Sequence, residues 1–153
     1  MNSETQAKLA ALYQEDYQRW LSEMIVELRS RNFDRLDLEN LIEEIESLGK
    51  SEKRALASYL MRLCEHLLKV QYWETERDAC LRGWKVEIRN FRLQIARLLK
   101  DSPSLKNDLV ESFDQEYLNA RQLFLDASDW KAEVVPEKPC FTLEEALNEA
   151  WLP

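Results

Sequence analysis

The sequence has few of the residues from which catalytic and metal sites are built. It contains one histidine, two glycines and three cysteines, and Cys64, Cys80 and Cys140 lack the paired spacing of a zinc site. No glycine-rich phosphate-binding loop is present, and Leu63 stands three residues before His66, where a di-iron helix motif has glutamate. We therefore expect no cofactor and identify no catalytic residues.

Long apolar runs are also missing. None approaches the roughly 20 residues that cross a bilayer, and the opening residues MNSETQAKL lack the apolar core of a signal peptide. An odd number of dispersed cysteines is typical of a reducing compartment. We expect a soluble, cytoplasmic protein without a membrane partner.

Basic residues are outnumbered by acidic ones. The chain has 21 Lys and Arg against 29 Asp and Glu, which gives a net charge of -8. A net negative charge opposes nonspecific attraction to nucleic acid and to anionic lipid. The overall charge of this acidic protein therefore argues against both partners.

Helical periodicity is the strongest feature that is present. The stretch from Leu36 to Trp73 contains apolar residues at three- and four-residue steps, which is the spacing of one helix face. We expect the helix to begin near Leu38, with the Asp37 side chain accepting a hydrogen bond from a first-turn amide. The stretch begins with the apolar positions Leu38, Leu41, Ile42, Ile45 and Leu48 and continues with Leu56, Tyr59, Leu60, Leu63, Leu67 and Val70.

Gly49 leaves two interpretations of this stretch open. A glycine in a helix interior costs roughly 1 kcal/mol relative to alanine, so the helix could stop here and a second one start behind Ser51. The apolar positions keep the same phase on both sides of Gly49, however. The phase favours one long central helix, kinked or straight.

Further helices and a C-terminal tail flank this central stretch. We predict a first helix to about Arg29, a third from about Trp84 to Lys100, and a fourth from Pro103 to about Asp126. The start of the third stays open, because Thr75, Asp78 and Gly83 could each begin it.

The tail, residues 127–153, is too apolar to stay free in solvent. We expect it to wrap onto the bundle and to end in a short helix from Leu143 to Ala150. The start of that helix is marked by a capping box of Thr142 and Glu145. The chain is therefore predicted to be one all-α domain over residues 1–153, a helical bundle with a long central helix.

The segment LDLENLIEEIESLGKSEKRAL resembles the signature of a bacterial family catalogued as domain of unknown function 29. Further similar segments are LYQEDYQRW, HLLKVQYW, LLKDSPSLK and FTLEEALNEAWLP, in the expected order along nearly the whole chain. The resemblance implies a small, soluble, all-helical bacterial protein. It implies no activity and no catalytic residues.

Three carboxylates of the central helix form a candidate metal site. Glu39, Glu43 and Glu46 stand at positions i, i+4 and i+7 and can share a helix face, where they could bind a hard cation. A solvated or salt-bridged acidic face explains the same spacing. We favour that interpretation, because a dinuclear carboxylate site would add Glu-x-x-His motifs from facing helices, and the sequence contains none.

Charge is distributed unevenly between two predicted helices. Residues 37–48 contain five acids and no base, whereas residues 81–100 contain six bases and one acid. We expect the two to pair within the chain or between subunits. The interaction candidates are Glu43, Glu44 and Glu46 on one side and a basic stripe of Arg82, Lys85, Arg89 and Arg92 on the other.

A full helical scaffold without a chemical site favours a noncatalytic protein-interaction module, regulatory or antitoxin-like, that binds a protein partner or another copy of itself. Two alternatives stay open. One is an enzyme or metal-binding protein that uses the acidic face. The other is a nucleic-acid binder that uses the basic stripe.

Overall fold

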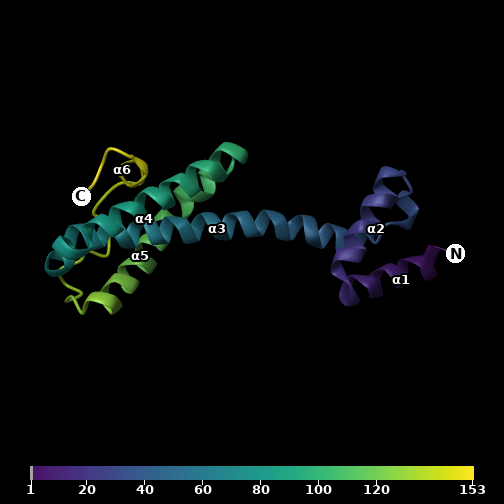
Figure 1. Ribbon diagram of the computed structural model, residues 1–153, viewed down its shortest axis with the longest axis horizontal. Coiled ribbons are helices and arrows are strands. Elements are labelled where there is room, and N and C mark those ends of the chain that lie inside the picture. Colours follow the sequence, from purple (N-terminus) through teal and green to yellow (C-terminus); the bar gives the residue numbers. More distant parts are fainter. Residues whose placement is uncertain (1) are drawn as a thin grey trace. The chain divides into compact units, whose positions relative to one another are not determined.

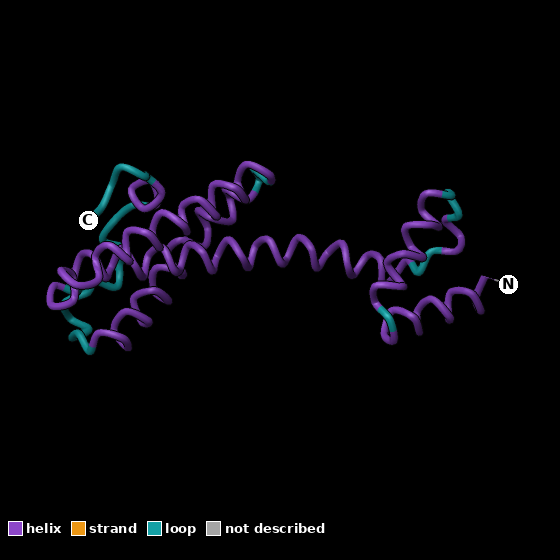
Figure 2. The backbone as a smooth tube through the Cα atoms, in the orientation of Figure 1, coloured by secondary structure: helices purple, strands orange, loops and turns teal. Residues whose placement is uncertain are grey.

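The computed structural model describes residues 2–153, and their side chains from residue 4 onward. Over this range the chain forms helices and no strand, which confirms the all-α prediction (Figures 1 and 2). The elements are α1 (Asn2–Glu15), α2 (Tyr17–Arg29), the short 3-10 helix η1 (Phe33–Arg35), α3 (Leu38–Tyr72), α4 (Glu74–Asp101), α5 (Leu105–Ser128) and α6 (Leu143–Leu147).

The chain divides into two compact units, Met1–Ser51 and Glu52–Pro153. We call them unit 1 and unit 2. Unit 1 contains α1, α2, η1 and the first turns of α3, and unit 2 contains the rest of α3 with α4, α5 and α6. The expectation that residues 1–153 form a single domain stays a prediction.

The first predicted helix is wrong in one respect, because it is broken at Asp16. This residue leaves the helical conformation, with φ -149° and ψ 85°, and its Oδ1 accepts a hydrogen bond from the backbone amide of Arg19 at 3.1 Å. Aspartate favours this capping role over a helix interior, because its short side chain satisfies a free first-turn amide. Two helices, α1 and α2, therefore replace the single one.

Unit 1 has a small core built around Trp20. Trp20, Met24 and Leu36 are buried, and Leu41 of α3 packs against them. The Trp20 indole Nε1 donates to Oδ2 of Asp37 at 3.0 Å, and the side-chain amide of Asn40 donates to the same oxygen at 2.7 Å. Asp37 thus binds two side chains at the start of α3, which begins at Leu38 as expected. The expected hydrogen bond from a first-turn backbone amide to Asp37 stays a prediction.

The long central helix is continuous through Gly49, as its phase predicted. Neither glycine of the chain has a positive φ, and a Cβ built on Gly49 would meet nothing within 4 Å. Gly49 is thus an ordinary helical residue, and nothing in its surroundings requires the absence of a side chain.

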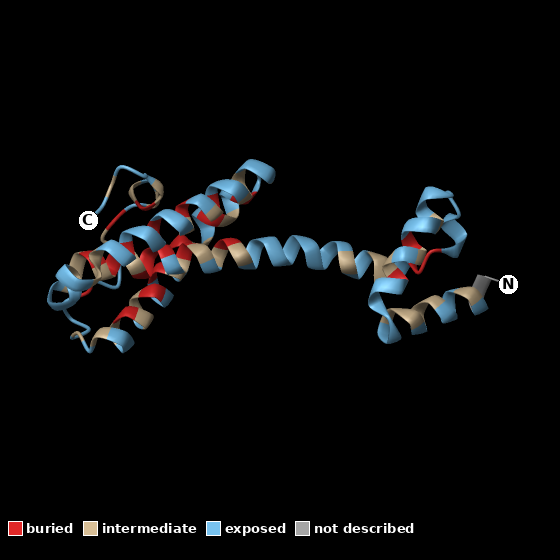
Figure 3. Ribbon diagram, viewed as in Figure 1, coloured by how far each residue is buried: buried red, intermediate tan, exposed pale blue. Residues whose placement is uncertain are grey.

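Unit 2 has a larger core that is centred on α3. From Leu56 to Val70, α3 buries most of its apolar face against α4, α5 and the C-terminal segment (Figure 3). Trp84, Ile88 and Ile95 supply the α4 side of this core. The α5 side is supplied by Leu105, Leu109, Phe113, Tyr117, Ala120 and Phe124.

Two of these helices begin at other residues than predicted. α4 begins at Glu74, ahead of all three candidate starts, and runs unbroken through Gly83. α5 begins at Leu105 and not at Pro103, because the amide of Leu105 bonds to the carbonyl of Ser102 at 3.0 Å in a tight turn. Pro103 and Ser104 belong to that turn.

The C-terminal segment wraps onto unit 2 as predicted. Val135, Phe141 and Ala146 are buried in the core, and the hydroxyl of Tyr117 donates to the carbonyl of Pro136 at 2.9 Å. The capping box of Thr142 and Glu145 is present at the start of α6. The helix ends at Leu147 and not at Ala150, because Asn148 has an extended conformation with ψ 116°.

The structure of Gly49 predicts that Gly49→Ala stabilises the protein. Alanine should raise the free energy of unfolding by about 0.5–1 kcal/mol, because it lowers the entropy of the unfolded chain and fits the helical backbone. Urea unfolding followed by circular dichroism measures the change, with Gly83→Ala as a matched second site. A loss of stability at Gly49 would show that this residue is not helical.

Candidate functional site

Four large apolar residues of α3 lie exposed in unit 1. Leu38, Ile42, Ile45 and Leu48 are 58%, 48%, 61% and 68% exposed, and we call them the apolar patch. Their periodic spacing is that of a buried helix face, yet of the apolar residues from 38 to 48 only Leu41 packs against the Trp20 core. Contiguous exposed apolar surface of this kind marks interaction sites in soluble proteins.

The carboxylates beside the apolar patch differ in their surroundings. Glu39, Glu43 and Glu46 are exposed. Glu44 is bound within unit 1, where it accepts hydrogen bonds from the hydroxyls of Tyr13 at 2.6 Å and Tyr17 at 2.7 Å. Glu44 therefore holds α3 against α1 and α2.

These two hydrogen bonds shift the pKa values of all three groups. They lower the pKa of Glu44 because they stabilise its charged form. The bond to Glu44 likewise raises the pKa of Tyr13 to about 12, and it raises the pKa of Tyr17, because ionising either hydroxyl would remove the donated proton. The carboxylate of Glu44 is thus charged and occupied, whereas Glu39, Glu43 and Glu46 face solvent.

In the part of the chain that the structure describes, no further ligands come to the candidate metal site. Among residues 2–153, no three His, Cys, Asp or Glu side chains come close enough together to hold a metal ion. Glu39, Glu43 and Glu46 follow one another along the helix as a row of separate carboxylates.

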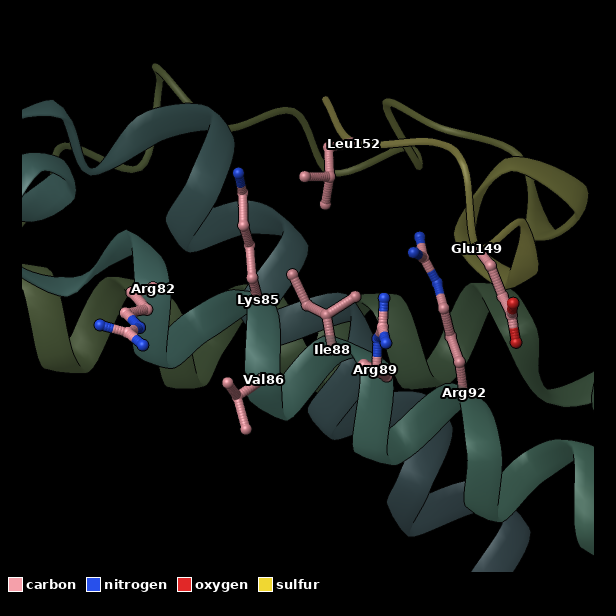
Figure 4. A pocket seen from close by; sticks show the side chains of 8 residues that line it. All are labelled: Arg82, Lys85, Val86, Ile88, Arg89, Arg92, Glu149 and Leu152. Carbon is pink, nitrogen blue, oxygen red and sulfur yellow. The ribbon is translucent and has the colours of Figure 1, made fainter.

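A groove of about 430 Å³ lies on unit 2 between α4 and the C-terminal segment (Figure 4). We call it the basic groove. Lys85 and Arg92 extend from α4 toward the C-terminal segment, and Leu152 points back toward Ile88. The groove is lined by Arg82, Lys85, Val86, Ile88, Arg89, Arg92, Glu149 and Leu152.

Three bases of the groove are exposed and lack a charged partner within unit 2. Arg82, Lys85 and Arg89 lie on solvent-exposed positions of α4, and none of the ion pairs in residues 52–153 includes them. These pairs join Lys53 to Asp108, and Arg62 and Lys69 to Glu65. The predicted pairing of the basic stripe with Glu39, Glu43, Glu44 or Glu46 stays a prediction.

Arg92, the fourth base of the stripe, has a structural role. Its side chain is buried, and its Nε and Nη2 donate to the carbonyls of Ala146 at 2.8 Å and Trp151 at 2.9 Å. Burial lowers the pKa of this guanidinium, and nearby Glu149 opposes the shift. The sequence offered a signal for this role: Ile88, Arg92 and Ile95 stand at i, i+4 and i+7, the spacing of the core face.

The sequence did not indicate that the C-terminal segment would form one wall of this groove. Glu149 and Leu152 line it because the two bonds of Arg92 hold Ala146 and Trp151 beside α4. The apolar character of FTLEEALNEAWLP indicated that this segment packs on the bundle, but not which helix it would border.

His66 and Cys64 do not form a catalytic pair. Nδ1 of His66 lies 2.8 Å from the carbonyl of Arg62, and its ring packs on Phe91 with centroids 5.5 Å apart. Burial lowers the pKa of His66 and raises the pKa of the Cys64 thiol. A nucleophilic cysteine needs a lowered thiol pKa. The buried environments of the two residues therefore favour an inert Cys64 thiol and a His66 side chain that serves in packing.

None of the helices in residues 2–153 combines the length and apolar character needed to cross a membrane.

The sequence model of the family described as domain of unknown function DUF29 matches residues 12–152. No curated protein and no solved structure matches the chain.

The bonds of Arg92 predict that Arg92→Met destabilises unit 2. The change leaves the carbonyls of Ala146 and Trp151 without their charged donor, and hydrogen bonds of this type contribute about 1.5–3 kcal/mol each. We expect the free energy of unfolding to fall by about 3 kcal/mol or more in urea titrations. Arg97→Met, five residues away and exposed, is the matched control and should change it by less than about 0.5 kcal/mol. Equal effects at both positions would contradict the structural role of Arg92.

Proposed function

The chain belongs to the family described as domain of unknown function DUF29, and from that premise we propose that it is a noncatalytic protein-interaction module that binds a partner protein through the apolar patch. Its role in the cell would be to occupy a surface of that partner, as a regulatory or antitoxin-like protein does. The exposure of Leu38, Ile42, Ile45 and Leu48 is the observation that carries this proposal.

The apolar patch offers enough surface to drive association. Complete burial of a leucine or isoleucine side chain is worth about 1.5–3 kcal/mol. The four side chains are half to two-thirds exposed, so a partner that covers them would gain about 1 kcal/mol or more from each. The exposed apolar residues of unit 2, such as Val110, do not form a comparable row along one helix face.

The exposed carboxylates define the kind of partner that fits. Glu39, Glu43 and Glu46 run beside the apolar patch over two turns of α3. A partner helix with apolar residues in its centre and bases at its edge would satisfy both features. Exposed ion pairs contribute only about 0–1 kcal/mol each, so the carboxylates select the partner and its orientation more than they strengthen binding.

This proposal predicts that replacing Ile42 and Ile45 by glutamate abolishes partner binding without unfolding the chain. Both side chains are exposed, so the change should leave helix content and stability nearly unchanged. The tagged full chain and the double variant are used to recover partners from native cells. We expect at least tenfold less partner with the variant, because about 1.4 kcal/mol corresponds to a tenfold change in affinity.

Val110→Glu is the matched control for this experiment. Val110 lies on α5 and is 59% exposed, close to the 61% of Ile45. The control variant should recover the partner as the unchanged chain does. Equal recovery with the Ile42 and Ile45 variant would contradict the proposed use of the apolar patch.

A further inference from the structure

We infer that the partner of the apolar patch is a second copy of this chain, whose basic groove receives it. This inference rests on the proposed function and names the partner. The patch of one copy, with its exposed carboxylates, would lie against Arg82, Lys85 and Arg89 of the other copy. Both surfaces are exposed in the single chain.

Charge decides which of the exposed surfaces can face each other. Two apolar patches in contact would bring Glu39, Glu43 and Glu46 of one copy against the same acids of the other. Contact between two basic grooves would likewise bring the bases of one copy against the bases of the other. The patch and the groove carry opposite charges, so their contact avoids the repulsion of both self-pairings.

The charged rows of the two surfaces have matching lengths. Glu39 and Glu46, the ends of the acidic row, lie seven positions apart on α3 with Glu43 between them. The ends of the basic row, Arg82 and Arg89, lie seven positions apart on α4 with Lys85 between them. At about 1.5 Å of rise per residue, both rows extend over about 10 Å. Two helices that lie side by side could therefore pair all three acids with all three bases.

Apolar groups are present on both sides of the contact as well. Val86 is 61% exposed and Leu152 is 37% exposed, and both line the groove together with Ile88. In the complex, Val86 and Leu152 would contact Leu38, Ile42 and Ile45 of the other copy. The carbonyl bonds of Arg92 hold the groove wall in place before binding, so the groove is largely formed in advance.

A polyanion is the other ligand whose charge suits the groove bases. Phosphates would bind Arg82, Lys85 and Arg89, but they would gain nothing from Val86 and Leu152, and Glu149 at the groove edge would repel them. The mixed apolar and basic lining favours an amphipathic helix over a phosphate backbone.

A charge-reversal experiment on the purified full chain tests the inference. The acid variant carries Glu39→Lys and Glu46→Lys, and the base variant carries Arg82→Glu and Arg89→Glu. Sedimentation equilibrium should show the unchanged chain rising above its mass of 18.2 kDa with concentration. Each variant alone should associate at least tenfold more weakly. An equimolar mixture of the two should regain association, because each reversed surface then meets a complementary one.

A control variant, Glu111→Lys with Asp114→Lys on α5, changes the net charge as much as the acid variant does and should associate normally. An unchanged chain that stays at 18.2 kDa at every concentration would overturn the inference. So would a mixture that stays monomeric, or variants that associate as the unchanged chain does. Binding of duplex DNA by a monomeric chain at about 0.15 M salt, lost in the base variant, would overturn it in favour of a polyanion site.

This result can be separated from a failure of the proposed function. If the purified chain stays monomeric while recovery of a partner from cells still requires Ile42 and Ile45, the module binds a different protein and only the self-association is wrong. If recovery is also independent of Ile42 and Ile45, both proposals fail.

Discussion

Burial of the apolar face of α3 is the interaction on which the rest of unit 2 depends. From Leu56 to Val70 this face is covered by α4, α5 and the C-terminal segment, and its residues form the centre of the larger core. The same face continues in phase through Gly49 to Leu38, where four apolar residues are exposed. One helix thus uses one pattern for two purposes: folding in unit 2 and, as we propose, binding in unit 1.

Arginines that donate to backbone carbonyls fix the irregular parts of unit 2. Arg92 holds Ala146 and Trp151, and Arg121 holds Val135 at 2.9 Å and Ala132 at 2.8 Å. These carbonyls belong to a segment with little regular secondary structure, so they need donors from outside the segment. The guanidinium presents several N–H groups in a fixed geometry and can satisfy two carbonyls at once. The basic groove exists because the tail is held in this way.

Periodicity and capping signals predicted the all-helical class and most of the helices, but not every helix boundary and not all of the contacts. The phase of α3 across Gly49 and the box of Thr142 and Glu145 are local features, and both predictions are confirmed. The break at Asp16 was missed because the apolar pattern on either side continues without interruption. Exposure of the apolar patch could not be predicted, since periodicity shows that a face is apolar and not whether the chain covers it. Arg92 was grouped with its exposed neighbours because charge alone does not distinguish a buried base from a free one.

Hydroxyl-radical footprinting of the purified chain, at low and at high protein concentration, tests the central claim most directly. Ile42, Ile45 and Leu48 should be oxidised readily in dilute solution, where the patch is exposed. At high concentration they should become protected together with Val86 of the basic groove. Protection of the three residues that is already complete in dilute solution would show that the chain covers its own patch, and this would contradict the account.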